Sequence, residues 1–116
     1  MLLRPVSFDF DDTLVRGDRT PILQTEEIVR RWFAAGHPCV ITTARPPPDP
    51  GAVCTVILHC FRRHLPITQV YFTSLQLKGP TLHEIGAIVH YDDMEEQLRS
   101  AAEFGVRGVR VTKDWR

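Results

Sequence analysis

The chain has 116 residues, the length of one ordinary folded domain, and we expect a single domain over residues 1–116. Hydrophobic residues make up 43% of it and charged residues 24%, and 14 Lys and Arg balance 14 Asp and Glu. This composition excludes a disordered or fibrous protein, and the neutral total gives no sign of a bulk attraction to nucleic acid or to an anionic membrane.

The first predicted strand covers residues 1–9 and leads into an acidic loop. A buried parallel strand is normally a continuous apolar run, so this strand has the weakest pattern in the chain. Three residues interrupt its apolar run: Arg4, Pro5 and Ser7.

A helix is predicted over about residues 21–35. Thr20-Pro21 fits an N-cap followed by a first-turn proline, and apolar residues recur at helical spacing until Gly36, which fits a C-terminal cap. The next apolar run, residues 39–42, is rich in β-branched side chains and predicts a strand. The prolines that follow exclude regular structure over residues 46–50.

The second half of the chain continues this alternation. Asp49-Pro50 again fits a cap and a first-turn proline, and a wide apolar stripe predicts a helix from there to His64. Three more strands are predicted at residues 70–72, 88–91 and 106–111, and two more helices at residues 80–85 and 94–105.

Strands that alternate with helices in this way predict an α/β fold, with a doubly wound, five-stranded parallel sheet and helices on both faces. In such sheets the ligand site lies beyond the carboxyl ends of the strands, where the strand order reverses. Residues that are far apart in sequence but follow different strands are therefore expected to meet at one edge.

Five of the 14 acids fall in two clusters, Asp9, Asp11 and Asp12, and then Asp92 and Asp93, each after a predicted strand. Without them the chain would carry an excess of five positive charges. This distribution is expected where a cation neutralises the acids and a phosphate must approach, although a solvated acidic turn would have the same composition.

Two carboxylates two residues apart at a strand end can point into one pocket, and Mg²⁺ prefers such oxygen ligands. A calcium-binding EF-hand loop is excluded, because that loop needs Gly at its sixth position and Glu at its twelfth. This chain has Leu14 and Thr20 at those positions.

Four motifs in order carry a resemblance that covers essentially the whole chain. They are Asp9-Phe10-Asp11-Asp12-Thr13-Leu14, then Thr43-Ala44-Arg45, then Lys78, and then Asp92-Asp93. The chain resembles the haloacid dehalogenase superfamily of phosphohydrolases, and the first motif is the specific one. Asp12 stands where many members have Gly, although acidic residues also occur there.

The resemblance implies that Asp9 is the nucleophile and Asp11 the general acid and base. It implies that Mg²⁺ is held by Asp9, the Asp11 carbonyl and the Asp92-Asp93 pair, with Asp93 as the direct ligand and Asp92 as its neighbour. The remaining implied roles are phosphoryl contacts, made by Thr43, Lys78, Arg45, the adjoining Ala44 and the backbone amides near Phe10.

Each residue also has a structural alternative: Thr43 could end a strand, Lys78 could be a surface cation and Asp92 could cap a helix. His83 and His90 are interpreted as packing or surface residues, because Mg²⁺ does not seek imidazole.

The family usually inserts a cap domain after the first motif or between the second and third. Neither stretch is long enough here, so we expect a capless enzyme with an open rim that admits bulky phosphorylated substrates, such as a nucleotide or a nucleic-acid end. The oligomeric state is left open.

Two other classes compete with a phosphatase. A phospho-accepting receiver domain has a similar length, but it needs a lone Asp after its third strand, where this chain has Phe72-Thr73-Ser74. A catalytically silent binding module is the other alternative, which the intact acids disfavour.

No apolar run is long enough to cross a membrane, and the N-terminal apolar run Met1-Leu2-Leu3 is too short for a signal sequence. Cys39, Cys54 and Cys60 form no CxxC pair and lie in apolar stretches, so we expect reduced thiols and a cytoplasmic location.

Overall fold

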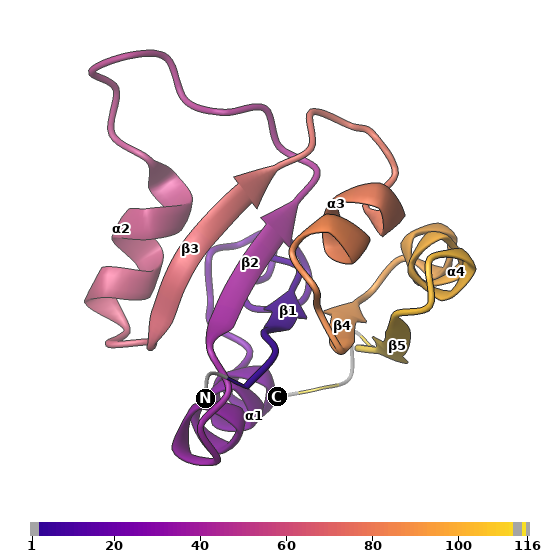
Figure 1. Cartoon of the computed structure of the whole chain (residues 1–116). Coiled ribbons are helices and arrows are strands. Elements are labelled where there is room, and N and C mark those ends of the chain that lie inside the picture. The colour runs from indigo at the N-terminus through magenta and orange to yellow at the C-terminus, as the bar shows by residue number, and fades with distance from the viewer. Residues whose placement is uncertain (1–2, 113–114, 116) are drawn as a thin grey trace.

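A computed structural model describes residues 3–112 and 115 (Figure 1). Strands and helices alternate along it as predicted. In chain order they are β1 (Val6–Phe8), α1 (Leu23–Ala34), β2 (Cys39–Thr43), α2 (Thr55–Arg62), β3 (Ile67–Phe72), α3 (Gly79–Glu84), β4 (Val89–Asp92), α4 (Glu95–Glu103) and β5 (Arg107–Arg110). The first two residues of the predicted strand 1–9, which also begin the short apolar run Met1-Leu2-Leu3, lie outside the described residues.

The five strands form one parallel sheet in the order β3-β2-β1-β4-β5. This confirms the predicted doubly wound α/β fold. The short strand β1 is central, and its three residues are fully buried between β2 and β4. The chain moves outward from β1 to β3 and then crosses to β4, so the strand order reverses between β1 and β4. A ligand site is expected at the carboxyl ends of these two strands.

The helices fall into two pairs, α1 with α2 and α3 with α4. Right-handed crossovers place the two pairs on opposite faces of the sheet (Figure 1). The buried carboxylate of Glu26 in α1 accepts two hydrogen bonds from Arg63, at the end of α2, both at 2.9 Å. On the other face Gly79 in α3 donates to Ser100 Oγ in α4. A Cβ at residue 79 would lie 2.4 Å from the Ser100 carbonyl oxygen, so only glycine permits this approach.

The start of α1 differs from the prediction. Its N-cap is Ile22, with no side-chain capping bond, and Thr20-Pro21 lies in the preceding loop. That loop folds back on the first motif, because Pro21 bridges Val15 and the Ile22 amide donates to the Leu14 carbonyl. The Thr20 hydroxyl donates to Asp18 instead of capping the helix.

The end of α1 confirms the predicted glycine cap. Gly36 has φ of +97°, its amide donates to the Phe33 carbonyl, and the His37 amide donates to the Trp32 carbonyl. These two bonds and the left-handed glycine make a Schellman motif.

The predicted start of the second helix at Asp49-Pro50 is also wrong. The Asp49 carbonyl accepts a hydrogen bond from the Ala52 amide, and Gly51 has φ of +81°, so this segment forms a turn. The helix α2 begins at Thr55. An Asp-Pro pair suits a turn as well as a helix start, and the glycine beside it favours the turn.

The wide apolar stripe predicted for this helix is only half covered. Val56 and Cys60 are buried, whereas 73% of Val53 and 76% of Phe61 are exposed to solvent. The physical reason is position, because α2 flanks β3, the strand at the edge of the sheet (Figure 1).

Within residues 3–112 and 115, no helix is long and apolar enough to cross a membrane.

The three cysteines are free, as predicted, but only Cys39 and Cys60 are buried and Cys54 is half-buried. Burial raises the pKa of Cys39 to about 11 and that of Cys60 to about 12. A raised pKa lowers the fraction of reactive thiolate at pH 8.

We therefore expect native protein to react with a thiol reagent at Cys54 first, and at the other two cysteines only after unfolding. Thiol titration with and without denaturant, followed by peptide mass spectrometry, would measure this. Equal rates for all three thiols in the native protein would contradict it.

Candidate active site between the first and fourth strands

The acidic residues of the first and fourth motifs meet at the reversal point of the sheet. Asp9 directly follows β1, and its backbone amide donates to the Tyr91 carbonyl in β4. Asp92 is the last residue of β4, and Asp93 follows it. Ligand oxygens of Asp9, Asp92 and Asp93 all lie within 4.8 Å of one another.

Lys78 lies at the centre of these acids, with only 1% of its surface exposed. Its Nζ donates to Asp9 Oδ1 and to Asp92 Oδ2, both at 2.7 Å. The amide of Lys78 donates to Gln97 Oε1 in α4 at 2.9 Å, which fixes the backbone at this point. The interpretation of Lys78 as a surface cation is therefore wrong, because its charge is buried between two carboxylates.

The pKa values of the two carboxylates bound by Lys78 are shifted in opposite directions. Burial raises the pKa of Asp9, even though Lys78 counteracts this. Burial would also raise the pKa of Asp92, but the hydrogen bond from His90 and the charge of Lys78 hold it well below its usual range. Asp92 is thus the carboxylate that stays ionised beside the Lys78 Nζ.

His90 belongs to a buried chain of polar groups that sequence analysis missed. His90 Nε2 lies 2.8 Å from Asp92 Oδ2, its Nδ1 lies 2.9 Å from Ser7 Oγ, and Ser7 Oγ lies 2.8 Å from Thr42 Oγ1. Burial lowers the pKa of His90, so the imidazole is neutral, and its single N–H faces the Asp92 carboxylate. The sequence held only a partial signal, because Ser7 interrupts the apolar run of the first strand. The structure supplies the register that pairs Ser7 with His90.

The third carboxylate of the cluster, Asp93, is half-buried. Burial, a hydrogen bond to Asp9 and the charges of Asp9 and Asp92 raise the pKa of Asp93 to about 7. Three carboxylates this close repel one another unless a proton or a cation lies between them. An all-oxygen cluster with this excess of negative charge suits Mg²⁺.

We expect Mg²⁺ to raise the melting temperature, because an ion that binds only the folded state stabilises it by about 2.7 kcal/mol at 100 times its Kd. Asp93→Asn should abolish most of this gain and should not lower the melting temperature without metal, since one repelling charge is gone. Asp18→Asn, on an exposed loop, is the matched control. Differential scanning calorimetry with Mg²⁺ and with chelator measures both. A metal effect of the same size in Asp93→Asn would contradict the site.

Asp11 points toward the second motif. Arg45 donates from Nε and Nη2 to the two carboxylate oxygens of Asp11, at 2.8 and 2.7 Å. The guanidinium also lies over the ring of Phe10, 5.2 Å from its centroid. The Asp11 side chain is 51% exposed, so this residue is held at the mouth of the site.

The second motif continues β2 into a tight turn. The Thr43 hydroxyl is buried and accepts a hydrogen bond from the Arg45 amide, which leaves its own hydrogen free to be donated. The Thr43 carbonyl binds the Thr73 amide and the Ala44 carbonyl binds the Leu75 amide, so the turn after β3 supports this loop.

The loop of the first motif is equally constrained. The Phe10 carbonyl accepts hydrogen bonds from the amides of Thr13, Leu14 and Val15, and the Thr13 hydroxyl donates to Asp9 Oδ2. Within residues 3–112 and 115, the amides of Phe10 and Asp11 have no hydrogen-bond partner. Asp12 is exposed and has φ of +60°, a left-handed conformation that glycine adopts without strain.

In the part of the chain that the structure describes, no cap domain covers this site. Only a loop lies between the first motif and α1, and only α2, β3 and their loops lie between Arg45 and Lys78.

Comparison with known proteins agrees with this architecture. The family model of haloacid dehalogenase-like hydrolases matches residues 6–109 and so includes all four motifs. Among curated proteins, none matches the chain.

Proposed function

The chain belongs to the haloacid dehalogenase-like hydrolases, and on this basis we propose that it is a Mg²⁺-dependent phosphomonoester hydrolase with Asp9 as nucleophile. One observation carries the proposal: the buried Lys78 ammonium lies 2.7 Å from both Asp9 and Asp92. A buried cation beside a carboxylate at the reversal point of the sheet is suited to a substrate that brings further negative charge.

In the first half of the proposed reaction, a carboxylate oxygen of Asp9 attacks phosphorus. A bond forms between Asp9 and phosphorus while the bond from phosphorus to the leaving oxygen breaks. Asp11 in its protonated form transfers a proton to that oxygen. The free amides of Phe10 and Asp11, the Thr43 hydroxyl and Lys78 are the groups that stabilise the phosphoryl oxygens.

In the second half, Asp11 is a carboxylate and takes a proton from water as the water oxygen attacks phosphorus. The bond between phosphorus and Asp9 breaks, which releases inorganic phosphate and restores the Asp9 carboxylate. Asp11 has to leave Arg45 to reach either proton, and its exposed position permits this movement.

Asp9 and Asp93, with the Asp11 carbonyl, are the groups proposed to hold Mg²⁺. Asp92 is a poorer ligand, because Lys78 and His90 occupy its Oδ2 and the Met94 amide occupies its Oδ1. The bound ion supplies positive charge that lets one anion approach another.

We propose that the substrate is a bulky phosphomonoester, either a nucleotide or a nucleic-acid end. The open rim supports a bulky leaving group. The overall excess of basic residues outside the acidic clusters supports an anionic substrate.

A panel of phosphomonoesters, assayed with Mg²⁺ and with excess chelator, tests the proposal. It should contain nucleotides, phosphorylated oligonucleotides, phosphopeptides and phosphoglycolate. We expect phosphate release only with metal. Equal release in chelator would contradict the metal dependence, and no release from any ester would favour a silent binding module.

A further inference from the structure

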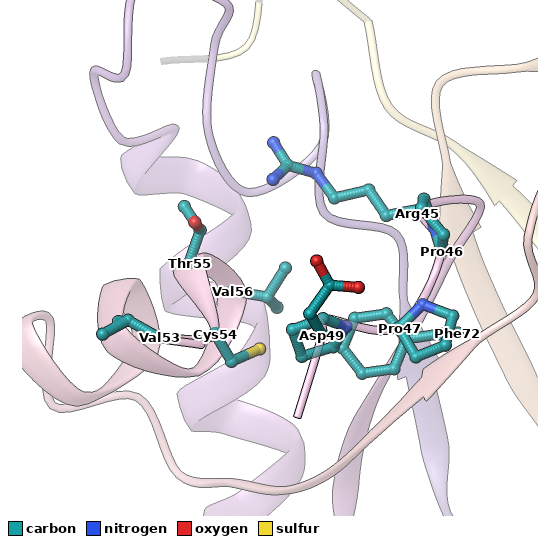
Figure 2. Close-up of a pocket in the computed structure, with 10 residues that line it drawn as sticks. Arg45, Pro46, Pro47, Asp49, Val53, Cys54, Thr55, Val56 and Phe72 are labelled. Atoms are coloured by element: carbon teal, nitrogen blue, oxygen red, sulfur yellow. The ribbon is translucent and has the colours of Figure 1, made fainter. Parts of the chain in front are cut away.

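A second feature beside the catalytic residues is a cavity of about 480 Å³ (Figure 2). One wall is built from the proline run after the second motif and from Phe72 at the end of β3, and the other from the start of α2. Its volume falls within the range of small-molecule sites. Its walls combine apolar side chains with the polar residues Arg45, Asp49 and Thr55.

Arg45 joins this cavity to the catalytic centre. It lines the cavity, and its guanidinium binds both carboxylate oxygens of Asp11. In the proposed reaction Asp11 protonates the leaving oxygen, so the leaving group has to lie on the Asp11 side of the phosphate. Arg45 is the residue that the cavity shares with that side of the site.

The lining residues define the chemistry that the cavity accepts. Three consecutive prolines, Pro46, Pro47 and Pro48, form a rigid wall, and Phe72 adds an aromatic ring. Such a wall suits a flat ring and loses little conformational entropy on binding. Asp49 projects a carboxylate between the two walls, where it can accept hydrogen bonds from hydroxyl groups (Figure 2).

The charge of the cavity excludes a highly anionic leaving group. Arg45 pairs with Asp11 in the structure and is left to contact the phosphoryl group when Asp11 moves. Among the described residues that line the cavity, Asp49 is therefore the charge that meets the leaving group. A second phosphate placed there would meet a carboxylate and be repelled.

We infer that this cavity is the leaving-group subsite, and that it takes an uncharged group with a planar ring and hydroxyl donors, of the nucleoside class. The inference rests on the proposed function and narrows its substrate to a mononucleotide in preference to a nucleic-acid end.

The first test is a selectivity ratio, the kcat/KM for a nucleoside monophosphate divided by that for phosphoglycolate. Phe72→Ala should lower this ratio roughly tenfold, because stacking of a base on an aromatic ring carries an effect of this order. Phe61→Ala, which removes an exposed ring outside the cavity, should leave the ratio unchanged.

The second test concerns charge and uses a variant on an exposed turn. Asp49→Asn should raise kcat/KM for a 5′-phosphorylated dinucleotide relative to the mononucleotide by about fivefold, since one like-charge repulsion is removed. Asp18→Asn is the matched control. A wild-type preference for the phosphorylated dinucleotide over the mononucleotide would overturn the inference.

The third test needs no catalysis. Cys54 lines the cavity and is half-buried, so its alkylation by iodoacetamide reports occupancy. An unphosphorylated nucleoside should slow this alkylation and glycerol should not, with Cys54→Ser as the control for the labelled site.

The outcomes separate the two proposals. In one outcome the protein hydrolyses phosphomonoesters, but a nucleoside does not protect Cys54 and neither Phe72→Ala nor Asp49→Asn changes its kcat/KM ratio. This outcome would overturn the subsite and leave the proposed phosphatase activity intact. Protection of Cys54 without hydrolysis of any ester would contradict the phosphatase while supporting the nucleoside site.

Discussion

Asp9→Asn should abolish phosphate release, with a larger loss than the roughly 10²- to 10⁴-fold expected when Asp11→Asn removes acid–base help. An amide cannot form the covalent intermediate. The substitution keeps the size of the side chain, and Lys78 retains its hydrogen bond to Asp92, so the fold should persist. Asp18→Asn is the control for the general effect of losing one carboxylate.

The two variants should also differ in what they accumulate. With p-nitrophenyl phosphate the leaving group needs no proton, so Asp11→Asn can still form the aspartyl phosphate. It cannot activate the water that hydrolyses it. We expect acid quenching and mass spectrometry to detect a phosphoryl adduct on Asp9 in Asp11→Asn. A phosphoryl adduct in Asp9→Asn would refute the assignment of the nucleophile.

The sequence predicted the sheet well because apolar runs mark β2, β3 and the start of β4, although polar residues interrupt β1 and β5. The doubly wound sheet and the meeting of Asp9 with Asp92 and Asp93 at one edge followed from the alternation of elements. The order of the strands, β3-β2-β1-β4-β5, was not predicted. The boundaries of α1 and α2 were predicted less well. Asp-Pro and Thr-Pro pairs suit turns and helix starts equally, and the loop contacts that decide between them are not local.

The polar interior could not be predicted from patterns of hydrophobicity. Ser7 counted against a buried strand, yet its hydroxyl joins Thr42 to His90 across three neighbouring strands. The pairing of Arg45 with Asp11 spans 34 residues and depends on where two loops lie relative to each other. Such contacts become visible only when the register of the sheet is known.

Lys78→Met should strongly destabilise the protein. It leaves Asp9 and Asp92 buried and facing each other without a cation, and losing one partner of a buried ion pair typically costs about 3–5 kcal/mol. For a chain of this size that lowers the melting temperature by more than about 10 °C. Arg99→Met, which removes an exposed ion pair to Glu95, should change the free energy of unfolding by less than about 1 kcal/mol. Urea denaturation measures both.

The double variant Lys78→Met/Asp92→Asn separates lost packing from unpaired charge. If the destabilisation comes from the carboxylate left without its cation, neutralising Asp92 as well should recover part of the loss, and the two effects should not add. Mg²⁺ should also stabilise Lys78→Met more than wild type, because the ion then supplies the missing positive charge. Additive losses in the double variant, with no extra gain from Mg²⁺, would show that Lys78 acts through packing and not through its charge.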